Sequence, residues 1–417
     1  MRIRAICLVI AVIIPLVLSA QDADTASVSL RDRLSLSGLA SVGYMTPVAG
    51  LSEELLHSHT TAYYDLRLRY QTRPEDRNAY DALFRYPVIQ VGVLVGDLTH
   101  IDVYRQRTPY HSTLGMTIAP YFGFQRNLFQ HGRWALGYVI QNGLSLNTRP
   151  FDETSNADNE YIGAHLSMHF GLALEARYRL TPHWTLSAAF DFKHNSAASM
   201  VRPNLGINAF GPTLGVTYDL APQSLEAMTQ QPSAQRVADI TRQPFRRRFY
   251  GEVMAAVIPK SLPDYFNVYR TADCPIYVAY TGMAGVMYRY RPHHASGLAL
   301  DYTYVPYTDR LRQLDALQHH DVVDGRPLRY SPHLFGLVLR HDIFYRHVSL
   351  NLGLGAFLHR RQGWRAETQE SPIYQLIGLR YSLPFTGDRL FLGYTVKAYR
   401  FSKVDGMLFN LGVRFPR

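Results

Sequence analysis

The chain contains little cysteine, since Cys7 and Cys274 are its only 2. Cys7 lies in an apolar run near the N-terminus, so the mature chain is expected to keep Cys274 alone. A single thiol cannot form an intramolecular disulfide, which excludes a disulfide-rich scaffold. No cysteine follows directly after that apolar run, which excludes a lipid-anchored lipoprotein.

Long apolar runs are absent beyond the first residues of the chain. Arg2 and Arg4 precede an apolar run that ends at Leu18, and small residues follow up to Ala20. This arrangement is typical of a secretory signal peptide, here residues 1–20. No later stretch has about 18 uninterrupted apolar residues, so transmembrane helices are not expected.

Acidic residues are in the minority, because 33 Asp and Glu stand against 43 Lys and Arg, giving a formal net charge of +10. A basic secreted protein suits an anionic partner. For an outer-membrane protein, the phosphorylated sugar of lipopolysaccharide is the nearest candidate, and a charge that serves only solubility is the alternative. No phosphate-binding glycine loop and no nucleic-acid signature is found, so neither a cofactor nor a nucleic acid is expected.

Aromatic residues and period-two alternation are abundant. The chain holds 29 Tyr and 20 Phe. Within residues 60–72, Tyr64 and Leu66 alternate with Asp65 and Arg67. Long alternating strands with many aromatic residues and no apolar helix are typical of transmembrane β-barrels. The sequence therefore predicts an all-β, antiparallel outer-membrane barrel, with a soluble secreted β-sandwich as the alternative.

Strands are expected in two groups separated by a polar connector at 221–245. The first group is expected at about 35–46, 60–72, 87–97, 113–125, 132–146, 162–180, 183–196 and 206–220. The second group is expected at about 246–259, 276–290, 295–306, 331–341, 346–359, 372–382, 388–400 and 406–415. Most turns after even-numbered strands are short, with 73–86 as an exception, so these turns are assigned to the periplasm and the long loops to the outside.

Polar residues interrupt the lipid-facing row of two neighbouring strands. In residues 183–196 the even positions carry the apolar face, and this row ends in His194 and Ser196. The apolar row of residues 206–220 begins with Asn208. An antiparallel pairing would bring the three side chains together near the outer leaflet, on a face where polar groups are costly.

The residues around this interruption form a motif, F-x-H-x-S followed by P-N-x-G-x-N. It resembles the outer-membrane lipid A 3-O-deacylase family, in particular the longer acyloxyacyl-hydrolase-like proteins of the Bacteroidetes. The matching residues are Phe192, His194, Ser196, Pro203, Asn204, Gly206 and Asn208. The resemblance covers roughly residues 36–220, and the rest of the chain resembles the C-terminal half of the longer relatives.

This resemblance implies an eight-stranded barrel with a serine-hydrolase site that faces lipid. It implies removal of the ester-linked acyl chain at the 3-position of lipid A, without a cofactor or a metal. By position, Ser196 would be the nucleophile, His194 its base and Asn208 the group that orients the imidazole. A serine needs such an adjacent base to attack an ester.

Two positions depart from the family pattern. The short members carry a glutamate where Asn208 stands, and an asparagine can orient an imidazole without adding charge. The family reads H-x-S-N-G, and its asparagine is expected to help hold the oxyanion, whereas this chain has Ala197 and Ala198. Losing a side-chain donor of this kind costs about 10²–10³ in rate. Loop N–H groups could substitute, and Asn195 and Asn204 are nearby, although the parity of Asn195 directs it to the other face.

Two alternatives remain open for the architecture. The chain could form one barrel of about 14–16 strands, or an eight-stranded deacylase barrel in residues 21–220 followed by a second barrel-like half in residues 246–417. The connector favours two units. The single barrel is slightly favoured, because tandem barrels are rare and the strand pattern is continuous.

A second function is also possible, namely a non-catalytic pore or transporter for a lipid or a small solute. Its lumen would be lined by charged residues, which are Asp65, Arg67, Arg69, Asp191 and Lys193. The adjacent histidines at 293–294 and 319–320 are not expected to bind a metal, because neighbouring strand residues point in opposite directions. The acidic residues of loop 151–160 are expected to be solvated, with a bridging divalent cation as the alternative.

Overall fold

The computed structural model describes residues 29–47, 56–104, 112–222, 245–320 and 322–416. The expected signal peptide lies outside the described residues, as does nearly all of the expected 221–245 connector. No helix in the described segments is long and apolar enough to cross a membrane.

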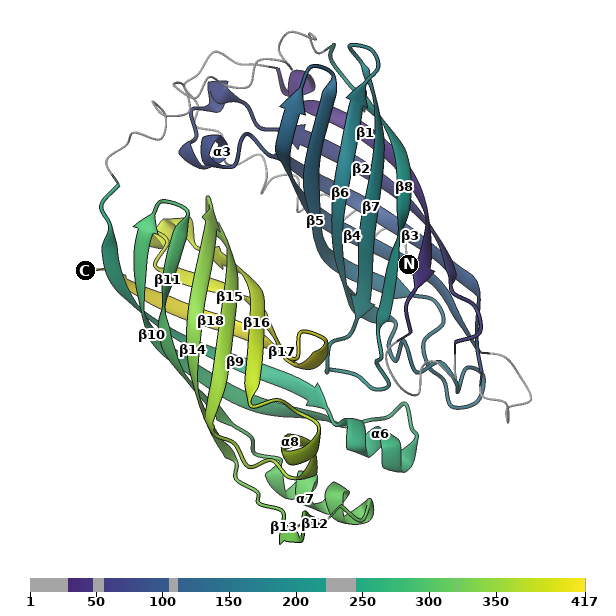
Figure 1. The fold of residues 1–417 in the computed structure, drawn as a ribbon, viewed down its shortest axis with the longest axis vertical. Helices are drawn as coiled ribbons and strands as arrows, with labels where there is room; N and C mark the ends of the chain where they lie inside the picture. Colours follow the sequence, from purple (N-terminus) through teal and green to yellow (C-terminus); the bar gives the residue numbers. More distant parts are fainter. Residues whose placement is uncertain (1–28, 48–55, 105–111, 223–244, 321, 417) are drawn as a thin grey trace.

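The described chain forms two closed barrels of eight strands each, which lie side by side in Figure 1. The strands of the N-terminal barrel are β1 (Leu34–Met45), β2 (Thr60–Gln71), β3 (Val88–Val103), β4 (Ser112–His131), β5 (Trp134–Asn147), β6 (Leu166–Arg179), β7 (Trp184–Ser196) and β8 (Ile207–Asp219). The barrel closes where β8 pairs antiparallel with β1, for example at Leu36 and Tyr218.

The C-terminal barrel is built in the same way. Its strands are β9 (Arg248–Ser261), β10 (Ile276–Arg291), β11 (His294–Tyr304), β14 (His333–Tyr345), β15 (Val348–His359), β16 (Ile373–Ser382), β17 (Leu390–Tyr399) and β18 (Lys403–Pro416). Closure comes from the pairing of β18 with β9, for example at Phe409 and Val257. Two short strands, β12 (Val322–Val323) and β13 (Arg326–Pro327), form a separate hairpin in a loop.

Short helices occupy the ends of the barrels. They are η1 (Leu30–Arg33), η2 (Pro74–Asp76), α3 (Ala79–Leu83), α6 (Pro263–Tyr269), α7 (Thr308–Leu317), α8 (Trp364–Thr368) and η3 (Pro384–Thr386). In Figure 1, α3 lies at the upper ends of the barrels, whereas α6, α7 and α8 lie at the lower end with the long loops.

The all-β antiparallel barrel that the alternation predicted is confirmed, and every predicted strand overlaps a barrel strand. The slightly favoured single barrel is wrong, since the chain adopts the two-barrel alternative. The physical reason is that β8 returns to β1, so the hydrogen-bonding edges of both strands are paired. No free edge is left for β9, and a closed barrel leaves no unpaired backbone in lipid.

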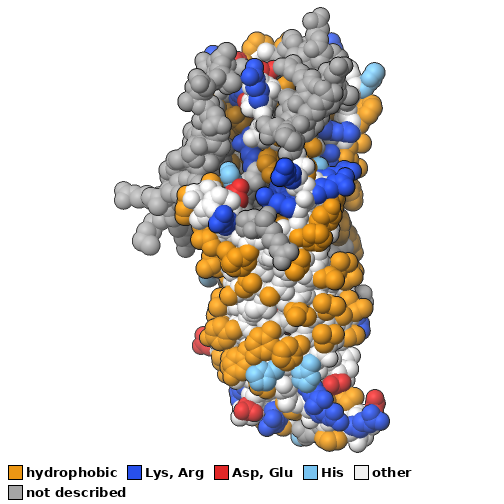
Figure 2. Space-filling view, turned by 90° about the vertical axis from the view of Figure 1, so that its left-hand side faces the viewer, with side chains coloured by type: hydrophobic (Ala, Val, Ile, Leu, Met, Phe, Trp, Pro, Cys, Tyr) orange, Lys and Arg blue, Asp and Glu red, His pale blue; other side chains and the backbone are white. Residues whose placement is uncertain are grey.

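The outer faces of both barrels are apolar, as the parity of the strands predicted. In β7, Trp184, Leu186 and Phe190 are exposed, whereas Thr185 and Ser187 between them are buried. Figure 2 shows apolar side chains in a broad band on one face of the molecule, with charged side chains gathered toward the ends. A band of this kind suits contact with lipid.

The lumen of the N-terminal barrel is filled by polar side chains. The charged residues expected to line it are all buried, namely Asp65, Arg67, Arg69, Asp191 and Lys193. Arg67 pairs with Asp65 at 2.8 Å and with Glu175 at 3.4 Å. Lys193 pairs with Asp191 at 2.5 Å. These side chains bond to one another across the barrel interior.

Candidate active site

The three predicted site residues lie at the adjoining ends of β7 and β8. His194 and Asn208 are direct partners in the antiparallel register. Nδ1 of His194 lies 2.7 Å from Oδ1 of Asn208. An amide oxygen can only accept, so this bond puts a proton on Nδ1 and leaves the lone pair on Nε2. Nε2 is therefore the ring atom that can accept a proton.

Ser196 is the last residue of β7, and its side chain is nearly buried, at 9% exposure. Its Oγ accepts hydrogen bonds from Nδ2 of Asn204 at 2.9 Å and from the main-chain N–H of Ala198 at 3.0 Å. A hydroxyl has two acceptor sites and one donor, so its own hydrogen stays available. Among the hydrogen bonds of the described residues, none joins this hydroxyl to the ring of His194.

Gly206 packs over both His194 and Ser196. A Cβ atom added to it would lie 3.3 Å from Cε1 of His194 and 3.4 Å from Cβ of Ser196. Gly206 also has a positive φ of 77°, a conformation that glycine adopts without steric cost. The imidazole and the serine thus lie beside the same point of the backbone, where a larger residue would be strained by the positive φ and would press on its neighbours.

Asn204 carries an amide group that faces Ser196. Its Oδ1 accepts from the main-chain N–H of Ala197 at 3.0 Å, and its Nδ2 also donates to the carbonyl of Ala198. These bonds fix the direction of the amide, so that one of its N–H groups donates to Oγ of Ser196 and the other to the carbonyl of Ala198. The sequence motif lacks an asparagine at position 197, but the loop brings the amide of Asn204 to Oγ of Ser196.

Asn195, the other nearby asparagine, does not reach the site. It is buried in the lumen, where its Oδ1 lies 2.9 Å from Nδ1 of His169. Aromatic residues border the site on the lipid-facing side instead. Phe192 stacks near His194 with ring centroids 6.2 Å apart, and near Phe210 at 4.7 Å. The site thus combines a base, a hydroxyl and two N–H donors next to an apolar surface.

Another serine–histidine pair lies on the outer face of the C-terminal barrel, and the sequence analysis did not predict it. Oγ of Ser296 and Nδ1 of His341 are 2.9 Å apart. Ser296 and His341 face each other in the register of β11 and β14. Both lie within the paired strands, where main-chain N–H groups are hydrogen-bonded to the neighbouring strand. No loop N–H group of the described residues is therefore bonded to this serine, as one is to Ser196, to hold an oxyanion.

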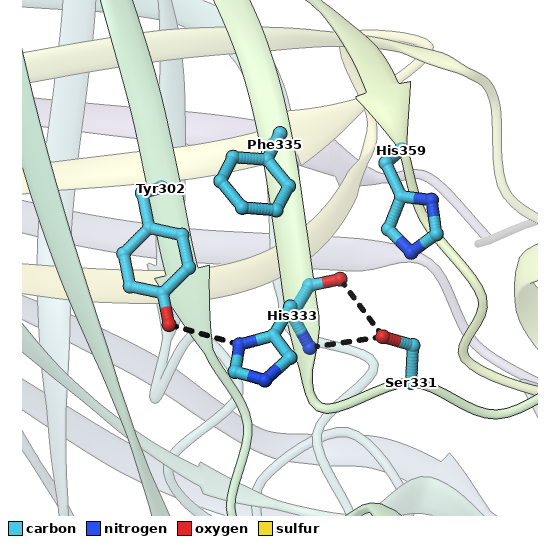
Figure 3. Close-up of a pocket in the computed structure, with 5 residues that line it drawn as sticks. All are labelled: Tyr302, Ser331, His333, Phe335 and His359. Carbon is cyan, nitrogen blue, oxygen red and sulfur yellow. Dashed lines mark hydrogen bonds between the residues drawn. The ribbon is translucent and has the colours of Figure 1, made fainter.

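A pocket of about 720 Å³ opens near the loop end of the C-terminal barrel and is shown in Figure 3. It is lined by Tyr302, Ser331, His333, Phe335 and His359. The hydroxyl of Tyr302 bonds to Nδ1 of His333 at 2.9 Å. Ser331 faces the main chain of His333, at 3.3 Å from N and 3.4 Å from O, and does not face an imidazole. This pocket therefore contains no serine with a base beside it.

The described residues contain no group of three or more His, Cys, Asp or Glu side chains placed to hold a metal ion. The acidic loop, residues 151–160, is bound by protein groups. Glu160 pairs with Arg270 at 2.6 Å, and Oε1 of Glu153 accepts from Thr271 at 2.7 Å. Both partners belong to the C-terminal barrel. The expectation of a solvated loop is therefore wrong for Glu160, which is buried against the second barrel, whereas Glu153 stays exposed while it accepts from Thr271.

Comparison with known proteins gives one family match and no match to a curated protein. Residues 251–417 match the family described as acyloxyacyl hydrolase, C-terminal domain. The matched range is the C-terminal barrel, whereas His194, Ser196 and Asn208 lie in the N-terminal barrel.

Solved structures give only distant likenesses. Neisserial surface protein A is 10% identical, with 45% of this chain and 96% of that chain covered and a TM-score of 0.28. An outer membrane channel from Pseudomonas putida F1 is 11% identical, with 95% and 100% covered and a TM-score of 0.20. A porin mutant from Rhodopseudomonas blastica is 9% identical, with 92% and 99% covered and a TM-score of 0.16. None of these likenesses carries an argument about function. Residues 251–417 are similar to the acyloxyacyl hydrolase, C-terminal domain family, and this match confirms the resemblance to the acyloxyacyl-hydrolase-like family that the sequence motif suggested.

Proposed function

We propose that this protein is an outer-membrane serine esterase that removes an ester-linked 3-hydroxyacyl chain from lipid A of lipopolysaccharide. The observation that carries the proposal is the bond of 2.7 Å between His194 and Asn208, which directs the free nitrogen of the imidazole away from the asparagine, at a strand end shared with Ser196. The resemblance of the motif and the family match of the C-terminal barrel support the same chemistry.

In the proposed reaction, Oγ of Ser196 attacks the ester carbonyl while Nε2 of His194 takes the hydroxyl proton. The carbonyl oxygen becomes an oxyanion beside Oγ. The N–H groups of Asn204 and Ala198, which lie within 3.0 Å of Oγ in the free protein, would turn from Oγ to this oxygen. The bond from carbon to the sugar oxygen then breaks, and His194 returns the proton to that oxygen. His194 then takes a proton from water, which attacks the acyl carbon. The bond between that carbon and Oγ breaks, His194 returns the proton to Oγ, and the fatty acid leaves with the serine restored.

The outward position of the site suits a substrate that is itself part of the membrane. The acyl chains of lipid A lie in the outer leaflet, so a site bordered by Phe192 and the exposed Phe210 would meet the ester without drawing the lipid into water. The net charge of +10 suits a phosphorylated lipid. Outer-membrane location after cleavage of residues 1–20 belongs to the same proposal.

The rival function is a non-catalytic pore or transporter, which a barrel fold would also suit. The packing of the lumen disfavours it, because Asp65, Arg67 and Lys193 are buried and bonded to neighbouring side chains. A channel needs a hydrated interior. Steady conductance of the purified protein in planar bilayers would favour the pore.

The test of the proposal is an assay of purified protein with lipopolysaccharide in mixed micelles. The wild type should release a 3-hydroxy fatty acid, and Ser196→Ala and His194→Ala should each abolish the release while the barrels stay folded and heat-modifiable on gels. Ser296→Ala is the matched control, because it removes the serine of the other Ser–His pair and should leave the release unchanged. A wild type that releases nothing, or equal release by Ser196→Ala, would contradict the proposal.

A further inference from the structure

The loop that carries the candidate oxyanion donors is bound to the C-terminal barrel. This loop, residues 197–206, accepts a hydrogen bond at the carbonyl of Ser199 from the main-chain N–H of Ser261, at 2.7 Å. In return, Nε of Arg202 donates to the carbonyl of Ser261 at 3.3 Å. Ser261 is the last residue of β9, so the end of this strand is attached directly to the candidate active-site loop.

The acidic loop, residues 151–160, is hydrogen-bonded to the end of loop 197–206. Its last residue, Glu160, accepts the N–H of Leu205 at its main-chain carbonyl, and Tyr161 accepts the N–H of Gly206, both at 3.0 Å. Gly206 is the residue that packs over His194 and Ser196. A shift of the acidic loop would therefore move the backbone that confines the base and the nucleophile.

The C-terminal barrel holds the acidic loop through α6 and the residues that follow it. Nη2 of Arg270 lies 2.6 Å from Oε1 of Glu160, whose side chain is 9% exposed. The guanidinium of Arg270 also lies over the ring of Phe266, 4.4 Å from its centroid, and Phe266 packs edge-on against Phe151 of the N-terminal barrel at 5.3 Å. Glu153 accepts from Thr271, and this hydrogen bond is the main cause that lowers the pKa of its carboxyl group.

We infer that α6 and Arg270 of the C-terminal barrel brace the candidate active site, by holding the acidic loop and through it Gly206 against His194 and Ser196. Arg270 is thus a positioning residue: it touches Glu160, and Glu160 in turn is paired with the loop that covers the site. This gives the C-terminal barrel, which has no part in the proposed catalytic steps, a role in the reaction. The inference rests on the proposed esterase function.

The opposite end of the same interface offers a matched control. There Arg346 of the C-terminal barrel pairs with the fully buried Asp81 of α3 at 2.6 Å. The hydroxyl of Tyr345 donates to the same carboxylate at 2.7 Å. This ion pair also joins the two barrels, but it does so through α3, which lies at the opposite end of Figure 1 from α6.

The test compares Arg270→Ala with Arg346→Ala in the full-length protein, with lipopolysaccharide micelles as substrate. Arg270→Ala should lower kcat by about 10-fold and leave KM within about twofold, because a misplaced catalytic group slows the chemical step without removing a substrate contact. Arg270→Lys should recover most of kcat, since it keeps the charge opposite Glu160. Arg346→Ala should keep the wild-type kcat.

A second measurement does not depend on activity. Hydrogen exchange at the amides of Leu205 and Gly206 should become faster in Arg270→Ala and stay unchanged in Arg346→Ala. Unchanged exchange in Arg270→Ala, an equal loss of kcat in Arg346→Ala, or a rise in KM alone would overturn the brace. Faster exchange in a protein whose wild type releases no fatty acid would instead support the brace and contradict the esterase.

Discussion

Asn204 is the residue on which the proposed oxyanion site depends most. The family asparagine would stand at position 197, where this chain has alanine. The loop folds back so that Nδ2 of Asn204 lies 2.9 Å from Oγ of Ser196, while the N–H of Ala197 holds the other end of the amide at 3.0 Å. An amide held in this way keeps a donor next to the reacting oxygen, so that only a small change of acceptor is needed when charge develops, and such preorganised donors are effective.

Replacing this amide should therefore slow the reaction more than it weakens binding. Asn204→Asp keeps the shape of the side chain but removes its N–H donors, and it should lower kcat by about 10²–10³ with little change in KM. Ala197→Asn should change the wild-type rate little, because the donor position is already filled, yet it should recover part of the rate in the Asn204→Asp background. The measurement is steady-state release of fatty acid. Unchanged kcat in Asn204→Asp would show that Asn204 is not the donor.

At the scale of the strands, the alternation of apolar and polar residues predicted most of what the structure shows. The parity of β7 predicted that His194 and Ser196 share a face with Phe190 and that Asp191 and Lys193 face the lumen. The burial agrees with this for Asp191 and Lys193 and up to His194, whereas Ser196 at the strand end is buried like its neighbour in the chain. An alternation with a period of two residues is a local property of the chain, so it can be read from a sequence. The pairing of His194 with Asn208 followed from the same parity once the two strands were taken as neighbours.

The features that the strand pattern did not predict depend on contacts between residues distant in sequence. Closure of β8 on β1 depends on strand tilt and stagger around a whole barrel, and a continuous strand pattern suits one barrel or two. The direction of the Asn204 amide depends on how loop 197–206 closes. The ion pair between Glu160 and Arg270 joins residues 110 positions apart, so the sequence alone left the acidic loop as a solvated loop.

The packed lumen of the C-terminal barrel gives a prediction about stability. Glu252, with a side chain 1% exposed, pairs with Arg380 at 2.7 Å and with Arg414 at 3.2 Å. Glu252→Gln would leave buried guanidinium groups without their counter-charge, and it should lower the free energy of unfolding by about 3–5 kcal/mol. Denaturant titration in detergent micelles measures this value.

The control for that prediction is an exposed ion pair of α7. Asp309 and Arg312 lie 3.5 Å apart with side chains 85% and 59% exposed. Asp309→Asn should change the free energy of unfolding by less than about 1 kcal/mol, because water screens this pair. Equal effects of the two substitutions would show that the buried network does not hold the barrel together.

At the scale of the whole molecule, the two barrels have the same orientation and are joined at both ends. The α3 segment reaches the turn end of the C-terminal barrel, where Asp81 pairs with Arg346, and α6 reaches the loop end of the N-terminal barrel, where Arg270 pairs with Glu160. The family match and the candidate site thus lie in different barrels that contact each other around the site loop. The two barrels therefore form one unit, with the candidate site next to the contact between them.

The measurement that tests the central claim most directly is mass spectrometry of lipid A from Gram-negative cells that produce the wild-type protein or Ser196→Ala at equal outer-membrane levels. The account predicts that lipid A from cells with the wild type loses the mass of one ester-linked 3-hydroxyacyl chain, whereas lipid A from cells with Ser196→Ala keeps that chain. Identical lipid A in the two strains, with both proteins folded in the outer membrane, would contradict it.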